Sequence, residues 1–96
     1  NVYEDEKTFA FLDVNPVSKG HTLIIPKKHY RNIYDIPENE LNEIMKVVKK
    51  IINRYKNILK MDGVNIVQSN EKIAGQIIFH FHIHLIPRYK EDGIKL

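Results

Sequence analysis

Three histidines alternate with bulky apolar residues near the C-terminal end of this chain. His80, His82 and His84 are separated by single apolar residues, and alternation with a period of two is typical of a β-strand with one buried face. On such a strand the imidazoles point to the same side, with neighbours roughly 6–7 Å apart, where they can bind a metal ion or handle an anion. The apolar residues are predicted to enter the core: Phe79, Phe81, Ile83 and Leu85.

The spacing leaves three interpretations of this cluster open. Incidental surface histidines are disfavoured because histidine is sparse, at 5 of 96 residues. A zinc site needs three imidazoles that converge on one ion, and two residues four apart on a flat strand are too distant for this. In nucleophilic catalysis, a neutral imidazole attacks phosphorus while its neighbours orient it and stabilise charge.

Other candidate residues lie elsewhere in the chain. His21 follows Gly20 at the start of an apolar stretch and can join the histidine cluster. The loop of residues 69–76 is polar and contains Gly75, and backbone N–H groups in such loops can bind phosphate. Asp13 closes another apolar stretch. Its carboxylate either forms an Asx-turn, which the spacing alone favours, or accepts hydrogen bonds from two ribose hydroxyls.

Periodicity and turn signals predict the elements that must hold these residues. Strands are predicted over residues 2–4, 8–12, 21–25, 64–68 and 76–86, the last one ended by Pro87. One long helix is predicted from near Pro37 to Asp62-Gly63. Its apolar face has three- and four-residue spacing: Leu41, Ile44, Met45, Val48, Ile51, Ile52, Tyr55, Ile58 and Leu59. Three strands, a helix and two strands indicate an α+β domain with a mainly antiparallel sheet.

Composition narrows the class of protein. The 96 residues, 43% of them hydrophobic, suffice for one domain. The sequence contains no cysteine, no membrane-spanning run and no secretory signal, which together favour an intracellular, cytoplasmic protein without membrane partners. A formal charge of +3 suits a small anionic ligand but is too small to indicate nucleic-acid binding. Because the chain opens without Met on strand-like residues, we expect further residues before it.

These features together resemble the histidine triad (HIT) family. Its hallmark is His-φ-His-φ-His-φ-φ, where φ is apolar, and residues 80–86 match it at every position. The segment of residues 84–89, His-Leu-Ile-Pro-Arg-Tyr, is similar to the Hint-like (protein kinase C inhibitor-like) branch. The resemblance covers residues 1–96 as a single HIT domain. Four more segments are similar to family blocks in the family order: residues 2–6, 10–13, 20–27 and 74–76.

The resemblance implies a fold and an activity. Family members are homodimers in which two subunits, each with five strands and one long helix, form a ten-stranded sheet. They bind purine nucleotides such as AMP and act as nucleotidyl hydrolases or transferases, with no cofactor required. We therefore predict a hydrolase that cleaves nucleoside 5′-phosphoramidates of the AMP-NH2 type through a nucleotidyl-histidine intermediate.

The resemblance also implies roles for individual residues. His82 is expected to be the nucleophile on the α-phosphorus, with its other ring nitrogen donating to a backbone carbonyl. His84 is expected to bind the phosphate and assist the leaving group, while His80 and His21 support the cluster. Asp13 matches the residue that binds the ribose hydroxyls. The remaining nucleotide-binding residues are the walls around the base, Phe11, Leu12 and Val14, and the phosphate loop, Asn70, Gly75 and Gln76.

Three departures from the family pattern keep alternatives open. Ile77 stands where a hydroxyl residue often follows the Gly-Gln pair, and Ser69 stands where Asn or Gln is common. The Cys-x-x-Cys segment of zinc-binding relatives is missing, although His29 lies where they supply a ligand. We predict no metal. The alternatives are a dinucleoside polyphosphate hydrolase, which the Hint-like segment argues against, a nucleotide- or partner-binding protein with little turnover, and a zinc-binding protein without a nucleotide role.

Overall fold

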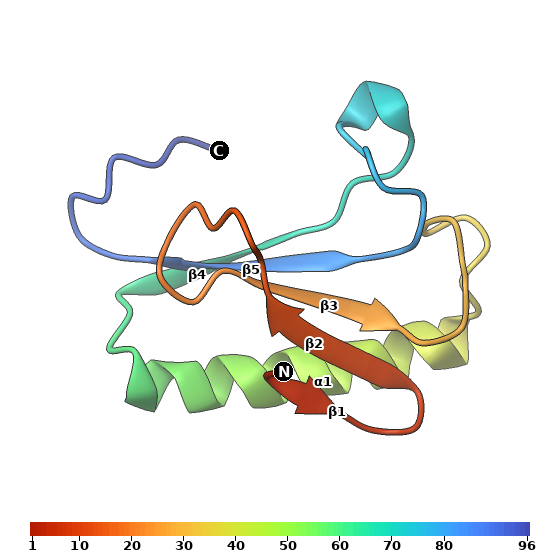
Figure 1. The fold of residues 1–96 in the computed structure, drawn as a ribbon, viewed down its shortest axis with the longest axis horizontal. Coiled ribbons are helices and arrows are strands. Elements are labelled where there is room, and N and C mark those ends of the chain that lie inside the picture. Colours follow the sequence, from red (N-terminus) through yellow and green to blue (C-terminus); the bar gives the residue numbers. More distant parts are fainter.

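A computed structural model describes residues 1–96 (Figure 1). Along the chain lie β1 (Tyr3–Glu4), β2 (Thr8–Leu12), β3 (Thr22–Pro26), α1 (Glu38–Ile58), β4 (Gly63–Val67), the short 3-10 helix η1 (Lys72–Ala74) and β5 (Ile83–Arg88). The five strands form one sheet in the order β1-β2-β3-β5-β4, with every neighbouring pair antiparallel. This arrangement confirms the prediction of an α+β fold with a five-stranded antiparallel sheet and one long helix.

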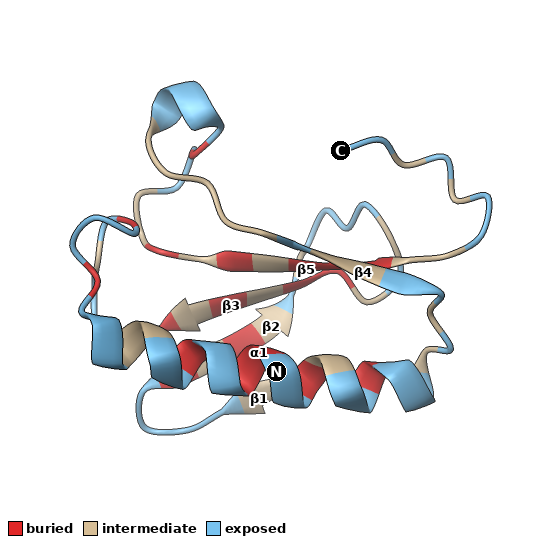
Figure 2. Ribbon diagram, turned by 180° about the vertical axis from the view of Figure 1, so that it is seen from behind, coloured by how far each residue is buried: buried red, intermediate tan, exposed pale blue.

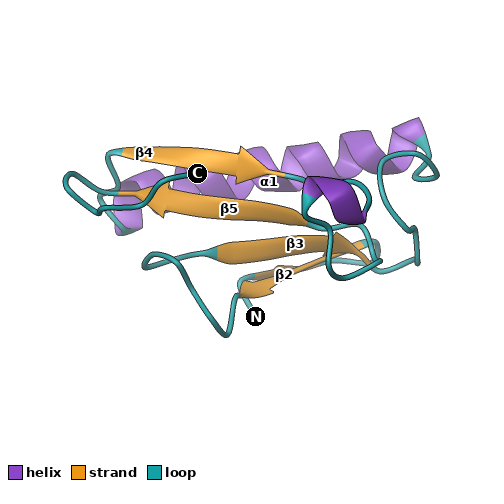
Figure 3. Cartoon of the chain, turned by 90° about the horizontal axis from the view of Figure 1, so that it is seen from above, coloured by secondary structure: helices purple, strands orange, loops and turns teal.

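The long helix α1 covers one face of the sheet, and the other face has only the short η1 on its side (Figure 3). Along β2, Ala10 is fully buried while Phe9 and Phe11 on either side are only half-buried, as the alternation of side chains across a pleated strand requires. The residues that face the helix join its apolar side in a single core (Figure 2). That core consists of Ala10, Ile24, Ile36, Ile44, Val47, Val48, Ile51, Tyr55, Phe81, Ile83 and Leu85.

Helix α1 begins after Pro37, as predicted, but it ends at Ile58 rather than at Asp62-Gly63. Lys60 takes a positive φ of 54° and turns the chain, and Gly63 already begins β4. The predicted apolar face is too wide, because Met45 and Ile58 are 41% and 65% exposed. No helix of this protein combines the length and apolar character needed to cross a membrane.

The last strand differs most from its prediction. β5 begins at Ile83 instead of residue 76, so of the three histidines only His84 lies on a strand. Residues 78–82 follow an irregular path because the backbone N–H of Phe81 donates to the carbonyl of Tyr30 at 2.7 Å, outside the sheet. Phe79, which was predicted to enter the core, instead lies under the Arg31 guanidinium, 4.3 Å from the ring centroid.

Pro87 does not end β5, which continues to Arg88. The pairing of β5 with β3 runs from Ile83 to Leu85, whereas its pairing with β4 extends to Arg88. Pro87 therefore lies where one side of β5 has no ladder partner. A residue without a backbone N–H is tolerated there.

Gly20 provides a test of how β3 is joined to the rest of the fold. It takes φ +92°, and an added Cβ would lie 2.5 Å from Cδ1 of Leu59 and 3.2 Å from Cγ of Pro87. We expect Gly20→Ala to lower the free energy of unfolding by about 1–3 kcal/mol, since the left-handed backbone disfavours a side chain and Leu59 must move. Denaturant unfolding measures the change.

Gly63→Ala is the matched control, because an added Cβ there has no atom within 4 Å. Its free energy of unfolding should stay within about 0.5 kcal/mol of the parent value. An equal loss in both variants would show that Gly20 is not specially constrained.

Candidate active site

A cavity of about 630 Å³ lies on the sheet face opposite α1. The strand register explains its composition, because Phe11 pairs with Leu23 and Leu23 pairs with His84. Residues directly opposite one another in a ladder share a face, so an apolar floor from β2 and β3 adjoins the histidines. The cavity is lined by Phe11, Asp13, Val14, Asn15, Leu23, Ile25, Ser69, Gly75, Ile77, Ile78, His80, His82 and His84.

The structure brings most of the predicted site residues to this cavity. Leu12 is an exception: it lies on the other face of the sheet, where it lines a groove with Tyr55 and Leu59. Adjacent residues on a strand point to opposite faces, so Leu12 cannot form the same wall as Phe11. The predicted residues that line the cavity are Phe11, Asp13, Val14, Gly75, His80, His82 and His84.

Six lining residues were not among the predicted site residues; two of them, Ser69 and Ile77, were noted only as departures from the family pattern. Leu23 and Ile25 could have been found from the alternation along β3, since they flank the fully buried Ile24. Asn15 and Ile78 carry no comparable signal, because irregular backbone brings them to the rim.

Asn70 and Gln76, predicted in the phosphate loop, do not line the cavity. The Asn70 carboxamide oxygen accepts a hydrogen bond from the backbone N–H of Ile33 at 2.8 Å. Gln76 is 2% exposed, and both its amide atoms bond to neighbouring loops. These two side chains hold the loop together, while Gly75 and Ser69 face the cavity.

The His82 ring is oriented by a backbone carbonyl two residues earlier in the chain. Its Nδ1 lies 2.8 Å from the carbonyl oxygen of His80. A carbonyl can only accept, so Nδ1 carries a proton and donates, and in the neutral ring Nε2 keeps its lone pair. Nε2 makes no hydrogen bond within the protein, and His82 lines the cavity. The ring therefore presents an unprotonated nitrogen to a ligand.

His84 carries its proton on the other ring nitrogen, Nε2, as two hydrogen bonds show. The backbone N–H of Val17 donates to Nδ1 of His21 at 3.2 Å, so the proton of a neutral His21 lies on Nε2. That proton is donated to Nδ1 of His84 at 3.0 Å. A neutral His84 must then carry its own proton on Nε2. The ring centroids of His82 and His84 lie 5.0 Å apart, which sets a hydrogen-bond donor beside the free lone pair.

His80 precedes β5 and is held by the last residue of β3. Its Nε2 donates to the carbonyl oxygen of Pro26 at 2.8 Å, which leaves Nδ1 as an acceptor. His29, outside the cavity lining, approaches that Nδ1 with its own Nδ1 at 3.4 Å. The carbonyl of His80 is also the acceptor for the next histidine of the triad, His82. The side chain of His80 thus binds β3, and its backbone carbonyl orients His82.

Asp13 forms the Asx-turn that its sequence context favours. Its Oδ1 accepts a hydrogen bond from the backbone N–H of Asn15 at 2.8 Å. Its Oδ2 lies 3.6 Å from Nε2 of His21, and the residue also lines the cavity. The turn therefore leaves one carboxylate oxygen next to the histidine cluster.

Burial keeps the two linked histidines neutral. It lowers the pKa of His21 below its usual value, and the Asp13 carboxylate opposes this only in part. Burial also lowers the pKa of His84, with further lowering from His82 and His21, since clustered imidazoles resist gaining charge together. At neutral pH these two rings are therefore uncharged.

Asp13, His21 and His84 could be considered a metal site, since one ligand atom of each lies within 4.8 Å of the others. Zinc requires an imidazole lone pair at about 2.0–2.1 Å. The Nε2 of His21 instead carries the proton shared with His84 across 3.0 Å. In this arrangement Nδ1 of His84 accepts from His21, while Oδ2 of Asp13 lies 3.6 Å from Nε2 of His21 without a hydrogen bond.

Residues 1–91 match the family model of the HIT domain. This chain belongs to the histidine triad family. It is 52% identical over 92 residues to an uncharacterised HIT-like protein of Methanocaldococcus jannaschii, covering 96% of this chain and 70% of that protein. It is 41% identical over 92 residues to an adenosine 5′-monophosphoramidase of Candida albicans, covering 92% of this chain and 60% of that enzyme.

The fold of a solved HIT family protein agrees with this assignment. The crystal structure of such a protein from Bacillus anthracis matches with a TM-score of 0.93 and 46% identity, over 98% of this chain and 67% of that one. This HIT chain therefore spans roughly two thirds of the length of these relatives.

The lowered pKa values predict a pH dependence of stability. His21 and His84 should titrate below the ordinary pKa of about 6.5, so the unfolded chain binds more protons than the folded one in this range. Their contribution to the free energy of unfolding is full above pH 6.5 and falls as the pH drops through their folded pKa values. Imidazole C–H chemical shifts recorded by NMR against pH measure both groups.

Replacing both residues by glutamine should flatten the stability profile between pH 6.5 and the folded pKa values. If the resonances of His21 and His84 titrate at or above 6.5, the neutral hydrogen-bonded chain described here is wrong.

Proposed function

We propose that this protein hydrolyses nucleoside 5′-phosphoramidates of the AMP-NH2 type, through a nucleotidyl intermediate on His82. The orientation of two rings carries the proposal: His82 presents a lone pair, and His84 presents an N–H beside it. A nucleophile next to a hydrogen-bond donor suits attack on phosphorus, where negative charge must be stabilised. The similarity to an adenosine 5′-monophosphoramidase supports the substrate class.

The lining of the cavity suits a purine nucleotide. Phe11, Leu23 and Ile25 supply an apolar surface for the base, and the Asp13 carboxylate stands at its end as an acceptor for ribose hydroxyls. A nucleoside placed in this way directs its 5′-phosphate towards the histidines. The loop residues Ser69 and Gly75 border the far side of that position.

The reaction follows from this placement. Nε2 of His82 attacks the α-phosphorus, the P–N bond breaks, and the amine leaves with a proton taken up from solvent. His84 donates a hydrogen bond from Nε2 to the phosphorus-bound oxygens or the departing nitrogen. Water then cleaves the N–P bond of the intermediate, which releases the nucleoside monophosphate and returns the proton. Catalysis is supplied by positioning and by oriented hydrogen bonds.

The charge of the cavity favours a substrate with a single phosphorus centre. No lysine or arginine lines it, so the extra phosphates of a dinucleoside polyphosphate would lack a cationic partner there. This supports the phosphoramidate over the polyphosphate substrate.

We also propose that two copies pair to make a ten-stranded sheet. β4 is an edge strand and exposes Ile66, at 49%. An exposed edge strand with an apolar side chain is a surface that a second copy can cover.

Replacing the nucleophile is the direct test of the proposed reaction. We expect the parent protein to turn over an adenosine 5′-phosphoramidate with a fluorogenic amine leaving group. His82→Ala should lower kcat by at least about 10³-fold, because no other cavity residue presents a free imidazole lone pair to phosphorus. Trapping with radiolabelled nucleotide should find a phosphorus–histidine adduct in the parent protein alone.

AMP binding and circular dichroism serve as controls for the fold of His82→Ala. Turnover that survives in His82→Ala would contradict the assignment of the nucleophile. A parent protein that binds AMP without turnover would instead indicate a nucleotide-binding protein.

The missing hydroxyl at Ile77 leads to a second prediction. Ile77 lines the cavity and is 86% exposed, so a serine there can donate a hydrogen bond to the departing nitrogen. We expect Ile77→Ser to raise kcat by roughly 2- to 10-fold, the equivalent of one hydrogen bond. Ile73→Ser is the control, since Ile73 is fully exposed outside the cavity. A lower or unchanged kcat in Ile77→Ser would show that the hydroxyl is not limiting.

A further inference from the structure

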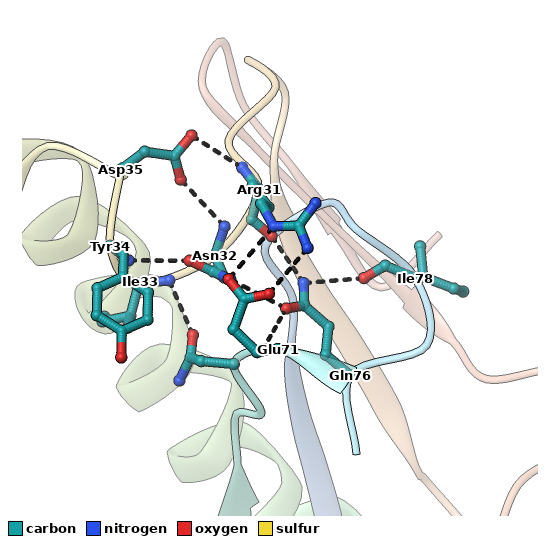
Figure 4. A network of polar contacts seen from close by, with 9 residues as sticks. Arg31, Asn32, Ile33, Tyr34, Asp35, Glu71, Gln76 and Ile78 are labelled. Atoms are coloured by element: carbon teal, nitrogen blue, oxygen red, sulfur yellow. Dashed lines mark hydrogen bonds and ion pairs between the residues drawn. The ribbon is translucent and has the colours of Figure 1, made fainter. Parts of the chain in front are cut away.

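The loop of residues 69–78 approaches the cavity without belonging to the sheet. It includes η1, which stands away from the strands on the side opposite α1 (Figure 1). Its ends supply Ser69, Gly75, Ile77 and Ile78 to the cavity lining. Since no strand ladder fixes this loop, its position depends on a polar network with residues 31–35 (Figure 4).

Two buried amides form the centre of this network. Gln76 and Asn32 are 2% and 1% exposed. The Gln76 oxygen accepts from the backbone N–H of Glu71 at 2.8 Å and from Nδ2 of Asn32 at 3.1 Å. The Gln76 nitrogen donates to the carbonyls of Arg31 at 2.7 Å and Ile78 at 3.1 Å. Both polar atoms of the Gln76 side chain make two hydrogen bonds each, so this side chain joins the two segments rigidly.

An ion pair closes the network on its outer side. The Arg31 guanidinium donates from Nη2 to Oε1 of Glu71 at 2.8 Å and from Nε to Oε2 at 3.3 Å. The same Oε2 also accepts from Nδ2 of Asn32 at 2.8 Å. Hydrogen bonds from Arg31 and Asn32 hold the pKa of Glu71 below its usual value, so the carboxylate stays ionised at neutral pH.

Arg31 connects this ion pair to the histidine segment. Its guanidinium carbon lies 4.3 Å from the centroid of the Phe79 ring, and Phe79 directly precedes His80. The backbone of Arg31 is fixed in turn, because its N–H donates to Oδ2 of Asp35 at 3.1 Å. One side chain thus contacts both irregular segments that border the cavity.

Glu71 adopts a backbone conformation that needs such support. Its φ of 75° and ψ of 157° lie in a region essentially restricted to glycine, where any other residue is strained. The hydrogen bond of its N–H to Gln76 and the ion pair of its side chain hold this conformation. The chain direction after Glu71 then sets where η1 and Gly75 lie.

We propose that Arg31 and Glu71 are positioning residues that hold the 69–78 loop in the conformation that receives the nucleotide phosphate. This inference rests on the proposed nucleotide-binding function. Neither side chain lines the cavity, so both act through the loop and through Phe79. The base and ribose side of the cavity, built on β2 and β3, does not depend on them.

Because the loop borders only the phosphate side of the cavity, comparing AMP with adenosine binding tests the proposal. Breaking the ion pair should weaken binding of AMP, whose phosphate faces the loop, and leave binding of adenosine unchanged. We expect Arg31→Gln and Glu71→Gln each to raise the Kd for AMP by about 3- to 10-fold. Titration calorimetry of the full chain with each ligand measures both constants.

Glu4→Gln is a matched control. It breaks the ion pair of Glu4 with Lys27, which has a length of 2.7 Å and side chains 46% and 39% exposed, close to the 41% and 52% of Glu71 and Arg31. Glu4 lies on the edge strand β1, away from the loop. Its substitution should leave the Kd values for AMP and adenosine unchanged.

Glu71→Gly distinguishes the contribution of the carboxylate from that of the backbone conformation. Glycine adopts the positive φ without strain, so this variant keeps the loop conformation accessible and removes only the carboxylate. We expect it to weaken AMP binding about as much as Glu71→Gln does.

The outcomes distinguish the two proposals. If the parent protein binds AMP and the Arg31 and Glu71 variants bind it equally well, or lose adenosine affinity to the same extent, the positioning role is overturned. AMP affinity that is kept in Glu71→Gly would assign the effect to the backbone and overturn it as well. A parent protein that binds neither ligand would overturn the proposed function and this inference with it.

Discussion

The chemistry of this site depends on backbone groups whose hydrogen-bonding character cannot change. A carbonyl can only accept, and the carbonyls of His80 and Pro26 therefore place protons on Nδ1 of His82 and Nε2 of His80. A backbone N–H can only donate, and that of Val17 places the proton of His21 on Nε2. Each imidazole has two tautomers in solution, but the fold selects one. As a result, neutral His82 is protonated on Nδ1 and neutral His84 on Nε2.

One face of the sheet packs against α1 to form the core, and the other face forms the ligand cavity. Ala10, Ile24 and Leu85 are fully buried towards α1, where close packing supplies stability. Their neighbours Phe11, Leu23 and His84 form a row across three strands on the other face. Because the core is complete on one side, the other can remain open around a ligand cavity without loss of the fold.

The histidine segment also shows why a catalytic stretch can leave regular secondary structure. In a continuous β-strand the backbone N–H and C=O groups of residues 80–82 would bond to neighbouring strands. Here the carbonyl of His80 is free to orient His82, and the N–H of Phe81 bonds to Tyr30 instead. Phe81 and Ile83 are still buried as the alternation predicts. The segment therefore keeps the side-chain alternation of a strand while its backbone serves the site.

The sequence by itself determined the family, the fold class and the residues that form the histidine cluster. The His-φ-His-φ-His motif, the period of the single helix and the apolar stretches of β2 and β3 are local patterns, and each depends on residues close together in the chain. The side-chain alternation even predicted correctly that Phe81, Ile83 and Leu85 are buried. The late start of β5 was not predictable, since a period of two describes which way side chains point and not where a ladder begins.

The tertiary structure alone decided the rest. The protons of His80 and His84 are placed by Pro26 and His21, which lie 54 and 63 residues away in the sequence. The burial of Gln76 depends on Asn32, which is 44 residues away in sequence. Leu12, which the family resemblance placed in the cavity wall, lies outside it because the pleat of β2 sends Leu12 and Phe11 to opposite faces. The proton positions and the burial of Gln76 are fixed by contacts between distant segments, and no pattern of neighbouring residues encodes them.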